Sequence, residues 1–233
     1  MLNHIFFDFF GTLVAYSPSR RDQGYSISHK ILKDAGATHS YDEFLDLWCI
    51  VSEEFDTSAE KTHREFSMME VGEAFLQRMF EQQPQAELTS RFVNAYLAEW
   101  NKGVRYLPDL SKFVERMSKR YRLGVITNTS DSEIVLNHLE QTGVRGLFDV
   151  VVTSVEFGLR KPHPDIFHFA MREVGAGPQS SAYVGDSFEA DYRGALAAGM
   201  RPFLIDPQNS SPVAEEARLA NLFDLEQRLV LAR

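Results

Sequence analysis

Cysteine is almost absent from this sequence of 233 residues, which contains only Cys49. No disulfide bond can therefore form within the chain. Cys49 lies among Leu45, Leu47 and Ile50 in a helical pattern, which favours a small buried side chain over a catalytic nucleophile.

Long hydrophobic runs are also absent. No stretch approaches the roughly 20 apolar residues of a membrane-spanning helix, and residues 1–10 lack the basic start and apolar core of a secretory signal. We therefore expect a protein of the reducing cytoplasm.

Positive charge is scarce as well. The chain has 24 Lys and Arg against 33 Asp and Glu, and its formal net charge is −9. This balance argues against a nucleic-acid groove or an anionic membrane surface as partner. A small anionic substrate remains compatible, because a bound metal ion or one lysine can reverse the potential inside a single pocket. The sequence carries no indication of an oligomeric state.

Short apolar runs predict buried strands. Their hydrophobic residues are continuous rather than alternating, which is typical of parallel strands covered on both faces. Helix-length patterns separate the later runs, at residues 110–120, 132–142, 164–174 and 189–198, and a final helix or two is expected over 213–233. This alternation predicts an α/β fold with a doubly wound, Rossmann-like parallel sheet. The predicted strands are Ile5–Asp8, Leu123–Thr127, Val150–Thr153, Ala182–Gly185 and Pro202–Ile205.

The segment from residue 16 to residue 102 breaks this alternation, because its periodicity is helical throughout. We expect it to be an inserted all-helical domain, a cap, on a core formed by residues 1–15 and 103–233. The cap helices are predicted at residues 25–35, 41–55, 62–80 and 89–100.

Polar residues follow several of the predicted strands. In an open α/β sheet, ligands bind at the carboxyl ends of the strands near the switch in strand order, so residues at these ends should converge on one pocket. Each has a structural explanation when taken alone, as a helix cap or a surface charge. Their joint placement favours a site. The candidates are Asp8, Thr127, Asn128, Lys161, Asp186 and Asp191.

The candidate residues suit a displacement by a carboxylate. Asp8 is the candidate nucleophile, which would split one difficult substitution into two easier ones. Mg²⁺ would hold this anion beside an anionic substrate, with Asp186 as a direct ligand and Asp191 as a second ligand or an acid behind it. Lys161 adds a fixed positive charge. Thr127, with the backbone amides of Asn128 and Thr129 at the start of a helix near Asp131, offers donors to anionic oxygens.

The motifs that contain these residues resemble those of the haloacid dehalogenase-like (HAD) hydrolase superfamily along nearly the whole chain. They are 8-DFFGTL-13, 126-ITNTS-130, 158-GLRKPHPDIF-167 and 183-YVGDSFEADYRGALAAGM-200. The helical insertion after the first motif is similar to the type-I cap of the subfamily that includes phosphoglycolate phosphatases. The resemblance implies a hydrolase that acts on a small phosphorylated metabolite with Mg²⁺.

The resemblance also assigns roles to single residues. It implies that Asp8 is the nucleophile, Thr127 a phosphate donor and Lys161 the stabilising cation. It implies Mg²⁺ ligation by Asp8, by Asp186 with Asp191 nearby, and by the backbone carbonyl of Phe10. A change of the side chain at position 10 leaves that carbonyl in place.

Position 10 departs from the family pattern. Family phosphatases usually have a second aspartate there, which protonates the leaving alcohol and then activates water. Phe10 has no ionisable group and can do neither. Activated phosphates would tolerate this loss, or a cap residue would supply the acid. The cap candidates for that acid are Glu53, Glu54, His63 and Glu65.

Three other interpretations remain open. The family's metal-independent 2-haloacid dehalogenases have an aromatic tyrosine at position 10, but they lack the acid pair retained here as Asp186 and Asp191. A catalytically quiet protein that binds a phosphorylated ligand would retain the pocket without turnover. A phosphonate-cleaving enzyme would need a cap lysine for a Schiff base, for which Lys30 and Lys33 are the candidates.

Overall fold

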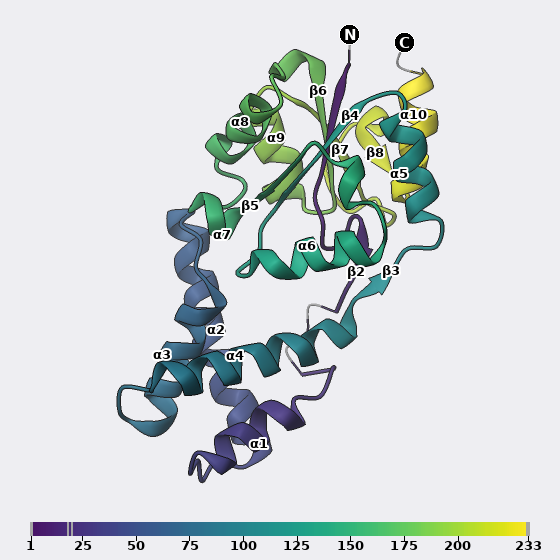
Figure 1. Cartoon of the computed structure of the whole chain (residues 1–233). Coiled ribbons are helices and arrows are strands. Elements are labelled where there is room, and N and C mark those ends of the chain that lie inside the picture. The colour runs from purple at the N-terminus through teal and green to yellow at the C-terminus, as the bar shows by residue number, and fades with distance from the viewer. Residues whose placement is uncertain (1, 18, 20, 232–233) are drawn as a thin grey trace. The chain divides into compact units, whose positions relative to one another are not determined.

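The computed structural model describes residues 2–17, 19 and 21–231 (Figure 1). The chain divides into two compact units, Met1–Ala15 with Tyr106–Arg233, and Tyr16–Arg105. The second boundary follows Arg105, whereas the sequence pattern placed it after residue 102. The two units are described separately below.

The first unit, the α/β unit, is built on a six-stranded sheet with the order β5-β4-β1-β6-β7-β8. Every neighbouring pair is parallel. The predicted α/β fold is therefore confirmed, and each predicted strand is present. The strands are β1 His4–Phe7, β4 Arg122–Thr127, β5 Val150–Thr153, β6 Ser181–Gly185, β7 Arg201–Ile205 and β8 Arg218–Leu219.

The last strand corrects the prediction that residues 213–233 are helical. Among the described residues of that segment, only α10, Leu225–Leu231, is an α-helix. β8 has two residues, which is too short to leave a pattern in the sequence. Arg218 of β8 forms an ion pair with Asp206, which also accepts hydrogen bonds from the backbone N–H groups of Ser210 and Ser211 (3.0 and 2.9 Å). This ion pair joins the short strand to the end of β7.

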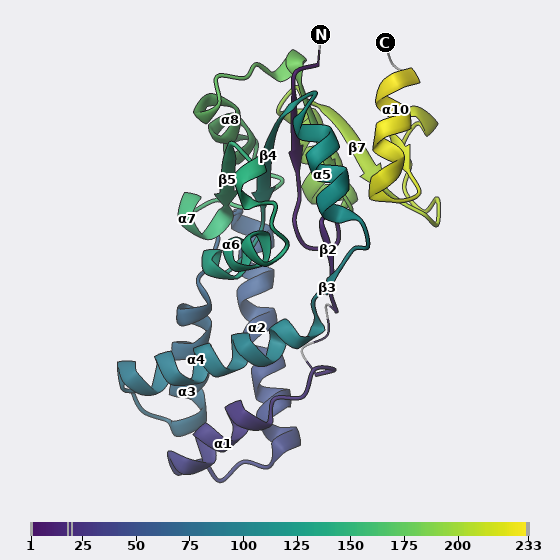
Figure 2. The same cartoon turned by 45° about the vertical axis from the view of Figure 1, so that its right-hand side comes forward.

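Helices cover both faces of the sheet (Figures 1 and 2). Side chains of alternating strand positions point to opposite faces. On one face, Phe6 and Tyr183 belong to a buried cluster with Phe167 of α8. On the other face, the ring of Phe7 packs edge-on against Phe113 of α5, with the centroids 6.3 Å apart. The helices of this unit are α5 Leu110–Ser118, α6 Ser132–Gln141, α7 Ser154–Phe157, α8 Pro164–Glu173, α9 Gly194–Ala197 and α10.

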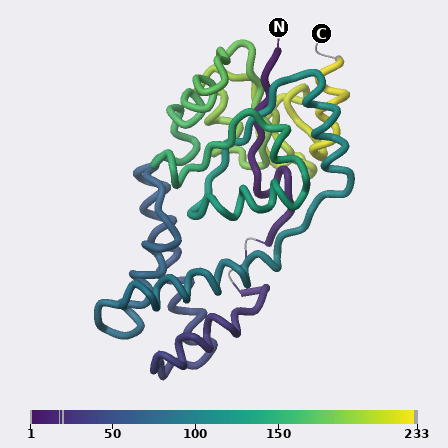
Figure 3. Tube along the Cα trace, viewed as in Figure 1, coloured from purple at the N-terminus to yellow at the C-terminus, as the bar shows by residue number. Residues whose placement is uncertain are grey.

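The strand order places β1 at the centre of the α/β unit, between β4 and β6 (Figure 3). From β1 the chain adds β4 and β5 on one side, and then returns to add β6, β7 and β8 on the other. The order therefore reverses beside β1. In sheets of this type, the carboxyl end of the strand at the reversal is where ligands bind.

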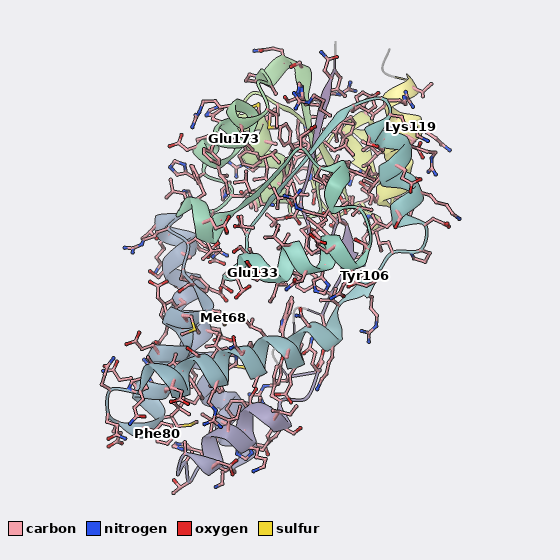
Figure 4. All side chains as sticks on the ribbon, in the orientation of Figure 1. Met68, Phe80, Tyr106, Lys119, Glu133 and Glu173 are labelled. Carbon is pink, nitrogen blue, oxygen red and sulfur yellow. The ribbon has the colours of Figure 1, made fainter. Side chains whose placement is uncertain are left out.

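The second unit, the helical unit, contains α1 Ser26–Asp34, α2 Tyr41–Thr62, α3 Met68–Phe80 and α4 Ala86–Trp100. The predicted helix start at residue 62 is wrong. α2 continues to Thr62, and α3 begins at Met68, behind a capping box in which Ser67 and Glu70 bond each other's backbone N–H. Met68 and Phe80, labelled in Figure 4, mark the two ends of α3.

Aromatic rings fill the interior of the helical unit. Trp48 packs edge-on against Phe75, with centroids 5.1 Å apart, and Phe75 stacks on Phe92 at 5.0 Å. These residues are therefore core rather than pocket. Two short strands, β2 Val14–Ala15 and β3 Arg105–Tyr106, pair where the chain passes between the units. Among the described residues, no helix combines the length and the apolar character that a bilayer crossing requires.

Glu99 of α4 supplies the N-terminal cap that α1 lacks. Tyr25, at the N-cap of α1, makes no side-chain cap. Glu99 is only 1% exposed, and it accepts hydrogen bonds from the backbone N–H groups of Ile27 and Ser28 (both 2.9 Å) and from the Ser28 hydroxyl (2.7 Å). A carboxylate near a helix N-terminus is also favoured by the helix dipole.

We expect Glu99→Ala to destabilise the helical unit. The change leaves buried donors without an acceptor, which typically costs about 1–3 kcal/mol. Glu99→Gln keeps one acceptor oxygen and serves as the matched control, with a smaller loss. Thermal unfolding monitored by circular dichroism measures both variants. Equal melting temperatures for Glu99→Ala and the wild type would contradict this role of Glu99.

Candidate active site

Asp8 lies directly after β1, at the carboxyl end of the central strand. Its backbone N–H donates to the carbonyl of Val184 in β6 (2.8 Å), and the residue is 6% exposed. The following turn requires glycine at position 11, where φ is +86°. A Cβ on Gly11 would lie only 2.1 Å from Oδ2 of Asp186. The turn therefore lets the Asp186 carboxylate approach the chain just beyond Asp8.

Lys161 joins two of the candidate carboxylates. Its ammonium donates to Oδ1 of Asp8 (2.7 Å), to Oδ1 of Asp191 (2.6 Å) and to the hydroxyl of Tyr183 (2.7 Å). The residue is 3% exposed. Burial opposes its charge, but Asp191 and Asp8 together raise the pKa of Lys161 above its ordinary value. Lys161 is thus a fixed buried cation beside the candidate nucleophile.

Asp191 projects from a π-helical turn, Phe188–Arg193, in the segment where a regular helix was predicted over 189–198. Its Oδ2 accepts from the backbone N–H of Ser187 (2.9 Å), while its Oδ1 accepts from Lys161. Both oxygens are therefore oriented by the protein. Single π-turns of this kind are frequent at functional sites, because the wider turn redirects one side chain.

The carboxylates of Asp8, Asp186 and Asp191 form a compact acidic group. One oxygen from each lies within 4.8 Å of the others. Burial, and then the charge of Asp191, raise the pKa of Asp8 to about 6 against the opposing effect of Lys161. Asp186 is partly exposed as a residue. The loss of water around its carboxyl group, and then the charges of Asp8 and Asp191, raise its pKa to about 7. One ammonium does not neutralise three carboxylates.

This arrangement fits a divalent cation. Carboxylate oxygens are the ligands that Mg²⁺ prefers, typically from one or two side chains, with waters and substrate oxygens completing the shell. Burial and the neighbouring carboxylates raise the pKa values of both Asp8 and Asp186, so ionising these groups is unfavourable without a further positive charge. Gly11 keeps the space beside Asp186 free of a side chain. The candidate ligands are the side chains of Asp8, Asp186 and Asp191 and the backbone carbonyl of Phe10.

Thr127 is the last residue of β4, next to β1 in the sheet. Its hydroxyl is fully buried and has no hydrogen-bond partner within the described part of the chain. A buried polar group without a partner is costly and unusual in a native protein. The Thr127 hydroxyl is therefore available to donate to a ligand oxygen.

The neighbouring residues differ from the sequence-based expectation. The Asn128 side chain accepts from the backbone N–H of Lys161 (2.8 Å) and donates to its carbonyl (3.0 Å), so it holds the Lys161 backbone. The N–H of Thr129 donates to the hydroxyl of Ser154 (2.9 Å). Helix α6 begins only at Ser132, with Asp131 as its cap. The helix therefore starts near Asp131 as expected, but the Thr129 amide is already bonded within the protein, which does not favour it as a ligand donor.

Phe10 occupies the position of the missing second acid. Its ring is half-buried and packs edge-on against Phe9, with the centroids 4.9 Å apart. Its backbone pairs with Val14 across the turn that carries Gly11. The turn therefore forms with phenylalanine at this position, and its side chain offers no proton.

The acid candidates of the cap all belong to the helical unit. Glu54 forms a two-bond ion pair with Arg78 (2.9 and 2.8 Å), which lowers the pKa of Glu54. This pairing makes Glu54 a poor proton donor. The Lys30 amino group is exposed and bonded to Asp34, and that of Lys33 is exposed as well. Neither lysine has the buried setting that a Schiff-base amine needs.

Tyr183 contacts the candidate site but is not among the candidates selected from the sequence. The sequence places it in a buried strand and at the start of the fourth motif, without a role of its own. The available signal was a hydroxyl-bearing ring within a strand that is buried at every position. A buried hydroxyl requires partners, and the Lys161 ammonium and the carbonyl of Ile126 provide them.

The comparisons with known proteins agree with the geometry. Residues 49–205 match the family model described as haloacid dehalogenase-like hydrolase. A glyceraldehyde 3-phosphate phosphatase from Methanothermobacter thermautotrophicus is 40% identical over 101 residues, which cover 42% of this chain and 43% of that protein. A pyrimidine 5′-nucleotidase from Escherichia coli is 31% identical over 127 residues, 53% of this chain and 56% of that protein. The matches thus span about half the length of these relatives.

Solved structures extend the similarity in fold over the whole chain. A 2-haloacid dehalogenase from Pseudomonas syringae pv. Tomato has a TM-score of 0.76 at 22% sequence identity, with 100% of both chains covered. At this identity the likeness concerns the fold alone. The family model covers well over half of the sequence and includes Thr127, Lys161, Asp186 and Asp191. The chain therefore belongs to the haloacid dehalogenase-like hydrolase family.

Proposed function

We propose that this protein is a Mg²⁺-dependent phosphatase of small phosphorylated metabolites. The observation that carries the proposal is the acidic group of Asp8, Asp186 and Asp191. One oxygen of each lies within 4.8 Å of the others, and a single buried ammonium binds two of the three carboxylates. Only a cation relieves this repulsion while keeping Asp8 ionised. The relatives named as phosphatase and nucleotidase support the same substrate class.

The chain's own residues would carry out two displacements. Oδ1 of Asp8 is held by Lys161, so we assign the attack on phosphorus to Oδ2. The new O–P bond forms as the bond to the leaving oxygen breaks, and that oxygen departs with the electron pair. Water then attacks the phosphorus, the bond to Asp8 breaks, and inorganic phosphate leaves with the carboxylate restored. Lys161 and the Thr127 hydroxyl would stabilise charge on the phosphoryl oxygens. A bound Mg²⁺ would supply further charge stabilisation.

Phe10 restricts the leaving group in this proposal. An alkoxide is a very poor leaving group without a proton, as the pKa of ~15.7 for water indicates. A carboxylate, with a pKa of about 4, leaves without one. We therefore propose that acyl or aryl phosphates react faster than alkyl phosphates, since the α/β unit offers no acid at position 10.

The test is an assay of the purified chain against acetyl phosphate, an aryl phosphate, an alkyl phosphate and 2-chloropropionate, with Mg²⁺ and with excess chelator. We expect phosphate release that requires Mg²⁺ and falls as the leaving group becomes more basic. Chloride release that is insensitive to chelator would support a dehalogenase instead, which the aromatic Phe10 makes the second candidate. Phosphate binding without turnover on any substrate would indicate a quiet binding protein.

Metal addition should stabilise the protein in a pH-dependent way. The raised pKa values of Asp8 and Asp186 mean that these groups favour the folded state while protonated. In metal-free protein, the contribution of these groups to the free energy of unfolding is complete below a pH of about 4. It is lost as the pH rises through about 6 to 7. Mg²⁺ binds the ionised carboxylates, so its stabilisation should increase over the same range.

We expect saturating Mg²⁺ to raise the melting temperature more at pH 8 than at pH 5. When the Mg²⁺ concentration is 100 times the dissociation constant, the free energy of unfolding rises by about 2.7 kcal/mol. For a chain of this size the melting temperature rises by roughly 5–10 °C. Asp186→Asn should lose most of this gain, while its metal-free form melts no lower than the wild type at pH 8. Sodium chloride at equal ionic strength is the control. A Mg²⁺ effect that is equal at both pH values would contradict the assignment of these ligands.

A further inference from the structure

The Tyr183 hydroxyl lies at the junction of the candidate catalytic lysine and the backbone of β4. It accepts from the Lys161 ammonium (2.7 Å) and lies 2.7 Å from the carbonyl oxygen of Ile126 and 3.2 Å from Oδ1 of Asp191. A phenol has one proton to donate. The Lys161 ammonium is the donor in its bond to the phenol oxygen, so the phenol proton is free for another acceptor. It goes to the nearer oxygen, the carbonyl of Ile126. Tyr183 thus connects Lys161 to the peptide bond between Ile126 and Thr127.

The same contacts define where the lysine nitrogen lies. An ammonium has three protons, and Lys161 donates them to Asp8, Asp191 and Tyr183. Two of these acceptors are carboxylates, which draw the nitrogen towards the acidic group. The third acceptor is the hydroxyl of Tyr183, which belongs to strand β6 rather than to a turn. Without it, the nitrogen would be held by the two charged oxygens alone.

Packing makes this anchor rigid. Tyr183 is fully buried, and its ring meets the ring of Phe167 edge-on with the centroids 5.1 Å apart. The Lys161 nitrogen lies 5.3 Å from the centroid of the Tyr183 ring. Phenylalanine would fill the same space in this apolar cluster. The hydroxyl therefore has no packing role, and burying it without its partners would be unfavourable.

We propose that Tyr183 is a positioning residue, which sets the Lys161 ammonium in register with Thr127 so that the lysine charge and the Thr127 hydroxyl act on the same anionic group of the substrate. The proposal rests on the phosphatase function proposed above. Tyr183 touches no substrate atom in this scheme and acts through Lys161. Its hydroxyl fixes the position of the charge at the end of a flexible side chain with four methylene groups, and a fixed charge is the requirement for stabilising charge in a transition state.

The test is Tyr183→Phe, which removes only the hydroxyl. We expect kcat to fall about 10- to 100-fold with KM nearly unchanged. This factor corresponds to the net free energy of a hydrogen bond to a charged group. Tyr121→Phe is the matched control, because Tyr121 is also buried but precedes β4, at the opposite end of the strand from Thr127. This control should keep the wild-type kcat. A crystal structure of Tyr183→Phe should show the Lys161 nitrogen displaced or in more than one position.

A double-mutant cycle separates positioning from general stability. In a Lys161→Met background, Tyr183→Phe should have little further effect on kcat/KM, because no ammonium remains to be positioned. Equal effects in both backgrounds, or an unchanged kcat in Tyr183→Phe, would overturn the inference. If the wild type itself releases no phosphate, the proposed function fails. The crystal structure of Tyr183→Phe then decides the inference, and an unmoved Lys161 nitrogen counts against it.

Discussion

Asp8→Asn should abolish phosphate release, with kcat lowered by about 10⁴ or more, the scale seen when a nucleophile is removed from a catalytic group that acts as a unit. Asparagine nearly preserves the shape of the side chain but cannot attack phosphorus as an anion. Asp8 sits at the reversal of strand order, with Oδ1 fixed by Lys161 and the acidic group beside it. No other carboxylate in the described α/β unit has this combination of contacts.

Stability separates this loss from a folding defect. The raised pKa of Asp8 means that its charge disfavours the folded state near pH 8. Asp8→Asn removes that charge, so the metal-free variant should melt no lower than the wild type at pH 8 while losing its activity. Asp34→Asn, at an exposed aspartate paired with Lys30, is the control and should leave kcat unchanged. Single-turnover assays with enzyme in excess measure the residual rate. Retention of more than a tenth of the wild-type rate would remove Asp8 from the nucleophile role.

Phe10→Asp should have the second largest effect, and in the opposite direction. A carboxyl group at this position would protonate the leaving oxygen and then activate water, and such general acid–base help is worth about 10²–10⁴ in rate. The gain should appear with alkyl phosphates, whose leaving group needs the proton. It should be small with acetyl phosphate, whose carboxylate leaves unaided. The expected outcome is therefore a flatter dependence of rate on leaving-group basicity.

The matched control is Phe10→Asn, because asparagine has nearly the same shape as aspartate but no ionisable proton. It should give no gain with any substrate, so a gain shared by both variants would point to space rather than to acid catalysis. No gain with Phe10→Asp would mean that another residue already provides the proton. Melting temperatures should accompany both assays, because Phe10 packs against Phe9 and either change removes that ring contact.

Much of the α/β unit could be predicted from local patterns. Each predicted strand is present within one residue of its observed start, because strands buried on both faces are continuous apolar runs with few alternatives. The two-residue β8 could not be predicted, since its apolar pattern is too short and its pairing with β7 is a tertiary contact. The start of α3 was wrong by six residues, because Ser67, rather than the amphipathic pattern, sets it.

The site divides in the same way. Asp8, Lys161, Asp186 and Asp191 could be selected from the sequence, because charged residues that follow buried strands of one parallel sheet must gather at one edge. Their partners could not be selected. Asn128 is recognisable as polar, but its pairing with the Lys161 backbone depends on how two loops meet. Glu99 similarly caps a helix more than 70 positions away in the chain.

The sequence by itself therefore determined the type of sheet, the candidate nucleophile and its acidic companions, and the absence of an acid at position 10. These features depend on side-chain identity and on periodicity along the chain. Only the tertiary structure decided which atoms hold Lys161, which amides are already occupied, and that the Tyr183 hydroxyl contacts the lysine. Hydrogen bonds act over about 3 Å in space and do not depend on separation in sequence, so such contacts leave no local pattern to read.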